Sequence, residues 1–201
     1  MAAFLTAAAP TPPPPAMGKA GEARGKVEAY LASHDVPDGA ELGELCAAPD
    51  KPLMAIVADA RVQGLLRARA AAALRLVPTP EVRAFLGKLV QTKAKASDAA
   101  DRLILRRTAV ALGWMAGPDA SEQLALLFEN EDAEVRLDAA IGIGLTRSAT
   151  APSLLRRQLA VETAARVRDQ IERQLHALAQ VQSEAEKPAV PKQRQPMRSG
   201  F

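Results

Sequence analysis

Aromatic residues are scarce in this sequence: they make up 3% of the 201 residues, although 48% of the chain is hydrophobic. A core must therefore be built from alanine, leucine, valine and isoleucine, which suits closely packed helices better than stacked sheets. The length accommodates one ordinary domain. Together these features predict an all-α fold.

Residues that carry chemistry are also few. The single cysteine, Cys46, excludes an intrachain disulfide but leaves the compartment open. The two histidines, His34 and His176, belong to no zinc-binding motif, so we expect them at the surface. No GxSxG or SxxK motif supplies an activated nucleophile, and no run of about 18 apolar residues could span a membrane. The sequence therefore predicts a non-enzymatic protein with no cofactor, no metal and no membrane span.

Both ends of the chain lack the hydrophobic period of a helix or strand. The start, MAAFLTAAAPTPPPPA, is rich in alanine and proline but lacks the basic flank of a signal peptide. The end, KPAVPKQRQPMRSGF, mixes prolines with four basic residues and no acid. We expect a disordered leader or signal remnant at 1–26, a folded domain at 27–182 and a basic, disordered tail at 183–201. The expected location is cytoplasmic, or periplasmic or secreted if the leader is a signal remnant.

Four ten-residue windows between these ends resemble one another. They read LRARAAAALR, ILRRTAVALG, VRLDAAIGIG and VRDQIERQLH, and they begin at Leu66, Ile104, Val135 and Val167. Their first, fifth, sixth and ninth positions fall on one face of an α-helix. Each window therefore predicts an inner helix that packs closely against its neighbours. The fifth, sixth and ninth residues are Ala70, Ala71 and Leu74; Thr108, Ala109 and Leu112; Ala139, Ala140 and Ile143; and Ile171, Glu172 and Leu175.

A second helical pattern precedes each of the last three windows. It consists of apolar pairs at spacing i, i+4, which mark an amphipathic helix. Polar stretches such as ENEDAE and AVETAA separate this helix from the window that follows. The repeating unit is thus predicted to be helix, turn, helix. The apolar pairs are Leu86 and Val90, Leu124 and Phe128, and Leu155 and Leu159.

The inner-helix pattern, V/L-R-x-x-A-A-x-A-L-G, resembles short HEAT repeats of the phycobilisome-lyase-like group over about 53–178. The best copy is 132–144, whereas the window from Ile104 has leucine in place of the arginine. The resemblance implies a right-handed α-solenoid, an armadillo-like superhelix of about four helix pairs. Glu172, which replaces an alanine in the last copy, predicts a polar outer face on a terminal capping helix.

The same resemblance implies a structural role for the arginine at the second position of each window. In such families this arginine pairs with acids of the interhelical turns and forms a ladder along the stack. A role in ligand binding stays open, because guanidinium groups also make good partner contacts. The matching arginines are Arg67, Arg136 and Arg168, and the expected acids are Asp59, Asp132 and Glu162.

Two further binding classes can be weighed from motifs and charge. A phosphate loop needs glycines before a helix, whereas Gly142 and Gly144 come late in one, so we expect them to permit close packing and to help end it. The pI of about 9.2 suggests nucleic acid. However, the net charge is +3 and residues 187–201 carry +4, so residues 1–186 sum to −1, which disfavours binding to a duplex.

The expected function is that of a scaffold or adaptor, a monomer that binds another protein through the concave or ridge surface of the solenoid. The alternatives are a bilin-lyase-like subunit, which the scarcity of aromatic residues disfavours, and a DNA-binding HEAT-like protein. The sequence is rich in alanine and arginine, which is typical of proteins from GC-rich bacteria. The candidate contact residues, chosen as polar positions beside the packed stripe, are Arg69, Arg107, Asp138 and Arg173.

Overall fold

The computed structural model describes residues 18–34, 37–117 and 119–185 of the chain. Within these ranges the protein is helical throughout and contains no strand, which confirms the all-α prediction. Residues 1–17 of the expected leader and 186–201 of the expected tail lie outside the described residues. The first helix begins at Lys19, so the expected boundary at residue 27 is too late, and the last helix continues past 182 to Ala185.

The described residues form ten α-helices and two 3₁₀ turns, and none of these helices is long and apolar enough to cross a membrane. In chain order the elements are α1 (Lys19–Ser33), α2 (Gly39–Leu45), α3 (Asp50–Ala58), α4 (Gly64–Ala73), η1 (Leu74–Leu76), α5 (Pro80–Lys93), α6 (Ala99–Met115), α7 (Ala120–Ala125), η2 (Leu126–Glu129), α8 (Ala133–Thr146), α9 (Ala151–Leu159) and α10 (Ala165–Ala185).

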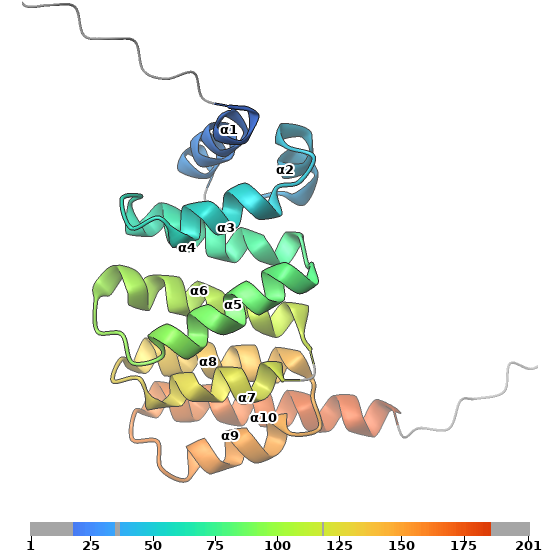
Figure 1. Ribbon diagram of the computed structural model, residues 1–201. Coiled ribbons are helices and arrows are strands. Elements are labelled where there is room, and N and C mark those ends of the chain that lie inside the picture. Colours follow the sequence, from blue (N-terminus) through green and yellow to red (C-terminus); the bar gives the residue numbers. More distant parts are fainter. Residues whose placement is uncertain (1–17, 35–36, 118, 186–201) are drawn as a thin grey trace, which may run out of the picture.

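Most of the helices lie in two layers (Figure 1). Helices α3, α5, α7 and α9 form the outer layer, and α4, α6, α8 and α10 form the inner layer. In the inner layer α4 packs on α6, α6 on α8 and α8 on α10, so neighbours in space follow chain order. Helices α1 and α10 consequently lie at opposite ends of the molecule, and each helix pair contacts mainly the pairs before and after it.

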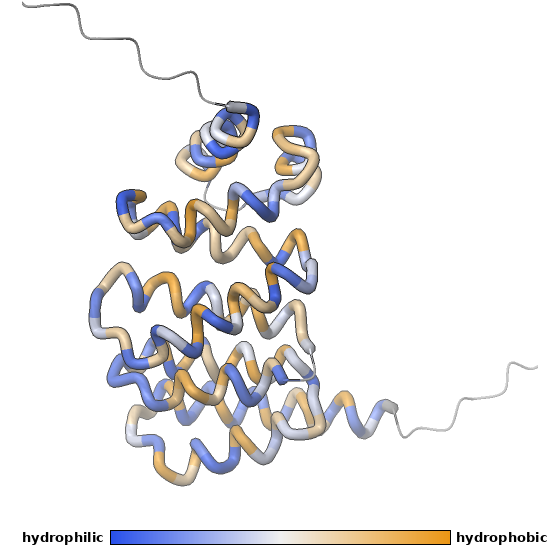
Figure 2. Tube along the Cα trace, viewed as in Figure 1, coloured by the Kyte–Doolittle hydropathy of each residue, from blue (hydrophilic) through white to orange (hydrophobic). Residues whose placement is uncertain are grey.

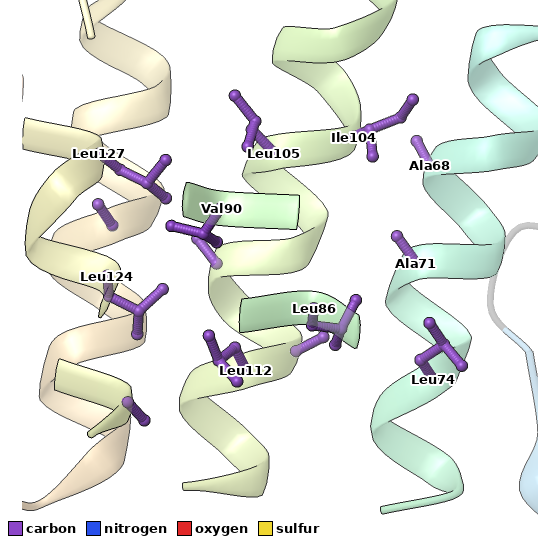
Figure 3. Packing of buried hydrophobic residues seen from close by; sticks show 14 of the residues in the cluster. Ala68, Ala71, Leu74, Leu86, Val90, Ile104, Leu105, Leu112, Leu124 and Leu127 are labelled. Atoms are coloured by element: carbon purple, nitrogen blue, oxygen red, sulfur yellow. The ribbon is translucent and has the colours of Figure 1, made fainter. Parts of the chain in front are cut away.

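The apolar stripes predicted from the sequence form the core between the layers. Apolar and polar residues alternate along each helix in Figure 2, as expected of amphipathic helices. Ala71, Ala109 and Ala140 are fully buried, and Figure 3 shows Ala71 on the face of α4 that points toward α6. Glu172 is exposed on α10. The prediction of a packed stripe with a polar terminal position is therefore confirmed.

Two glycines let α6 and α8 approach each other closely. A Cβ atom on Gly113 would lie 2.6 Å from the Cα of Gly142, and a Cβ on Gly142 would meet the carbonyl group of Ala109. Neither contact could be relieved by moving a flexible side chain, because the atoms that are met belong to backbone. The expected role of Gly142 in close packing is confirmed. The expectation that Gly144 helps to end the helix is wrong: α8 runs to Thr146, and Arg147 takes the left-handed cap with φ 51°.

Candidate functional site

A groove with a volume of about 440 Å³ lies between α4 and α6. Its lining comes from these two inner helices, the η1 turn and Pro37, with no residue from the outer layer. We refer to it as the α4–α6 groove. It is lined by Pro37, Leu65, Ala68, Arg69, Ala72, Ala73, Arg75, Leu76, Arg107, Val110, Ala111 and Trp114.

The helical period explains why these residues meet. Arg107, Val110 and Trp114 recur at intervals of three and four residues, so they share one side of α6. Buried residues such as Ala109 and Leu112 occupy another side of the same helix. Because the stripe that packs α6 into the core excludes Trp114, its side chain is left in the groove. The residue is 59% exposed, a high value for the largest apolar side chain of the protein.

The charged residues of the groove are all basic. They are Arg69, Arg75 and Arg107, and no acidic residue lines the groove within the described part of the chain. Arg69 is oriented by bonds that its guanidinium donates to the carbonyl oxygens of Leu31, at 2.8 Å, and Ala32, at 3.3 Å. Arg75 and Arg107 are exposed. The groove therefore combines apolar surface with positive charge.

Two of the four predicted contact residues, Arg69 and Arg107, lie together in the α4–α6 groove. Arg173 is exposed on α10 and donates to the Oε1 of Gln170 at 2.7 Å, and it is not part of the groove lining. The sequence analysis did not select Trp114. Its spacing of two helical turns from Arg107 was the available signal that both residues share one side of a helix.

Asp138, the predicted contact residue of α8, is largely enclosed by its neighbours. Its side chain is 13% exposed, and Arg106 of α6 donates to it from Nε at 2.6 Å. Burial raises the pKa of Asp138, despite the opposing effect of this bond. Asp138 therefore joins α8 to α6. The sequence pattern of α8 alone does not show which side chain of α6 lies opposite.

Of the predicted arginines and acids, Arg136 and Glu162 form a pair that further hydrogen bonds surround. Arg136 donates from Nε and Nη2 to the two carboxylate oxygens of Glu162, both at 2.9 Å. Its Nη1 donates to the carbonyl oxygens of Asn130 and Glu131, also at 2.9 Å. The side chain of Glu162 is only 1% exposed, and the Arg136 guanidinium lowers its pKa to about 2. Thus Arg136 ties its own turn to the turn of the next helix pair.

The other two predicted arginines, Arg67 and Arg168, have partners that differ from the expected acids. Arg67 pairs with Asp101 of α6, with 3.9 Å between the closest nitrogen and oxygen, and not with Asp59. Its Nε donates to the carbonyl oxygen of Val57 in the preceding helix. Likewise, Arg168 donates to the carbonyl oxygens of Leu159 and Glu162. The arginine at this position thus donates hydrogen bonds to backbone carbonyl oxygens of its own helix pair. Where another helix pair follows, the arginine also pairs with a carboxylate of that pair.

The remaining acids of the ladder pair with arginines that the sequence analysis did not select. Asp132 pairs with Arg102 at 3.2 Å, and Asp59 pairs with Arg24 at 2.7 Å. Bonds from Arg61 and Arg24 hold the pKa of Asp59 well below its ordinary value. Arg102 lies one helical turn before Leu105, the position at which the window from Ile104 lacks its arginine. Arg102 thus joins α6 to the residue that precedes α8.

A second groove, of about 660 Å³, lies near the turns that join the layers. It runs between the α7–η2 segment and α9, and Val161, which is 71% exposed, lies at its side. Arg136 and Glu162 line it as well, but their polar groups bond to each other. This groove, which we call the turn groove, therefore offers less unpaired charge than the α4–α6 groove.

The described residues include no group of three or more histidine, cysteine and acidic side chains placed to hold a metal ion. Cys46 is a free, half-buried thiol. His34 and His176 are both exposed, as expected, and the ring of His34 stacks on that of Tyr30 with 4.4 Å between the centroids.

No protein-family model, no curated protein and no solved structure matches this chain.

Proposed function

We propose that this protein is a non-catalytic adaptor that binds another protein through the α4–α6 groove. The observation that carries the proposal is the exposure of Trp114 in a groove flanked by arginines. Tryptophan and arginine are the residue types that most often dominate the binding energy of protein interfaces. A partner that covers Trp114 would remove its apolar ring from water, which accounts for a large side chain left outside the core.

The proposal includes the helical architecture: a right-handed, HEAT-like α-solenoid over about 53–178. Its support is threefold. The inner helices contact one another in chain order, the small residues of the repeated windows are buried, and ion pairs join consecutive units. In such a stack each unit depends on its neighbours for its core, so an extended surface is left free for binding.

The adaptor proposal predicts that Trp114→Ala weakens capture of the protein partner about thirtyfold, because hot-spot residues contribute about 2 kcal/mol or more. The wild type and variants would be used to capture proteins from extracts of the native host, with quantitative mass spectrometry of the bound fraction. The melting temperature should change little, because Trp114 is mostly outside the core.

Two controls accompany this measurement. Val161→Ala removes an even more exposed apolar side chain, but in the turn groove, and should leave capture unchanged. Deletion of 187–201 removes four basic residues and separates a nonspecific charge interaction from recognition by the helices. If the deletion abolishes capture while Trp114→Ala has no effect, the groove is not the binding surface.

A further inference from the structure

The groove's residues also indicate the chemistry of the partner. We propose that it binds an acidic peptide segment that carries an apolar anchor residue, with the anchor against Trp114 and the carboxylates against Arg75 and Arg107. This inference depends on the proposed function and specifies it further. Three features of the groove carry it: its apolar surface, its charge and its size.

The apolar surface accounts for the anchor. Leu65 is 45% exposed and Trp114 is 59% exposed, and Leu76 and Val110 also line the groove. A volume of about 440 Å³ is at the lower end of the range of ligand pockets, so it accommodates one or two side chains and not a folded domain surface. The occupant is therefore a short segment with a single apolar contact point.

The charge of the groove accounts for the acidic residues of the segment. Arg75 and Arg107 line it with no acid among the described lining residues, while residues 1–186 as a whole carry a formal charge of −1. The groove is thus more basic than this part of the chain taken as a whole. Arg75 and Arg107 are exposed, and neither forms an ion pair with a described residue, although the charge of Arg107 acts on Asp138 and opposes the rise in its pKa that burial causes. Their exposed guanidinium groups can therefore reach carboxylates of a partner.

Charge also argues against the chain's own ends as occupants. Residues 187–201 carry +4 and would be repelled by the arginines, and residues 1–17 contain no charged side chain that could pair with them. Single-stranded nucleic acid is also anionic, but its binding sites stack successive bases on several aromatic rings. Among the described residues that line the groove, Trp114 is the only aromatic one. The groove therefore fits an acidic peptide better.

The experiment uses the fluorescence of Trp114, the only tryptophan of the chain, as a direct probe of the groove. A display library of random twelve-residue peptides would be selected on the full-length protein, and the enriched peptides synthesised without tryptophan. We expect peptides with net negative charge and at least one apolar residue. Their binding should shift the emission of Trp114 to shorter wavelength, because the anchor excludes water from the indole.

The matched variants are Arg75→Glu with Arg107→Glu in the groove, and Arg157→Glu, an exposed arginine of the turn groove. The double variant should weaken binding of the acidic peptides at least about tenfold, and raised salt should weaken binding to the wild type. Arg157→Glu should bind as the wild type does. All three charges are exposed, so each variant should melt within a few degrees of the wild type.

Iodide and caesium quenching of Trp114 measures the local charge without any peptide. Relative to free N-acetyltryptophanamide, iodide should quench Trp114 more strongly than caesium does, and the double variant should reverse this preference. Equal relative quenching by iodide and caesium would overturn the proposal. So would a selection whose enriched peptides are neutral or basic, or one that enriches no peptide on the wild type over the double variant. Tighter binding of a dT12 oligonucleotide than of the selected peptides would also overturn it. If Trp114→Ala still abolishes capture of the native partner, the adaptor function stands and only the acidic chemistry fails.

Discussion

Gly142→Ala is expected to lower the free energy of unfolding by about 2 to 3 kcal/mol, although alanine is the better helix former. The added Cβ would meet the carbonyl group of Ala109 in α6, whose carbon would lie 3.0 Å away. Backbone cannot move aside as a flexible side chain can, so α6 and α8 must separate. That separation would loosen contacts along the whole interface of the two helices.

Gly25→Ala is the matched control for this variant. Gly25 lies within α1 and nothing is found within 4 Å of its potential Cβ position. Here the substitution should raise stability by about 0.5 to 1 kcal/mol through helix propensity alone. Urea unfolding followed by circular dichroism compares the two. Equal shifts for the two variants would show that α6 and α8 do not meet closely at Gly142.

Glu162→Gln is expected to lower the free energy of unfolding by about 3 kcal/mol at pH 7, because it breaks a buried, doubly bonded ion pair. The Arg136 guanidinium lowers the pKa of Glu162 from 4.5 to about 2 in the folded protein. The folded state therefore holds its proton more weakly than the unfolded state. The glutamate contributes its full stabilisation above pH 4.5, and this is lost as the pH falls from 4.5 to 2.

The pH profile distinguishes this ion pair from a merely structural contact. The stability of the wild type should fall steeply between pH 4.5 and 2, and that of Glu162→Gln should fall less steeply, because glutamine does not titrate. Glu129→Gln is the control: Glu129 pairs with Lys95 on the surface, where its side chain is 59% exposed, and should behave almost as the wild type does. Parallel profiles for the wild type and Glu162→Gln would contradict the role assigned to the pair.

The helices and their packed stripes were predictable from local sequence because both depend on a period of 3.6 residues. Ala71, Ala109 and Ala140 are buried because each is flanked at helical spacing by other apolar residues of its own window. The start of α1 was not predictable in this way. Its buried residues are only Val27 and Leu31, and the preceding half of the helix is held by long-range contacts such as that of Arg24 with Asp59.

The ion pairs and the groove were only partly predictable, because they depend on which helices become neighbours. The sequence indicated that Arg136 and Glu162 serve the ladder, but not that the arginine reaches forward to the next unit. Asp138 and Arg107 both occupy polar positions beside the packed stripe of their helices. Asp138 is nevertheless largely buried in an ion pair with Arg106 of α6, whereas Arg107 is exposed. Trp114 became informative only once its exposure between α4 and α6 was known.

Close contact and buried charge fix the inner helices relative to one another. Gly142 lets the backbones of α6 and α8 meet, and the buried pair of Arg136 and Glu162 joins consecutive helix pairs.

Site-specific photo-cross-linking tests most directly whether the α4–α6 groove is the surface that binds the partner. A p-benzoylphenylalanine residue would be placed either at Val110, in this groove, or at Val161, in the turn groove. After irradiation in extracts of the native host, we predict a cross-link from position 110 to the protein that the wild type captures, and none from position 161. A cross-link to that protein from position 161 alone would contradict the proposed location of the binding site.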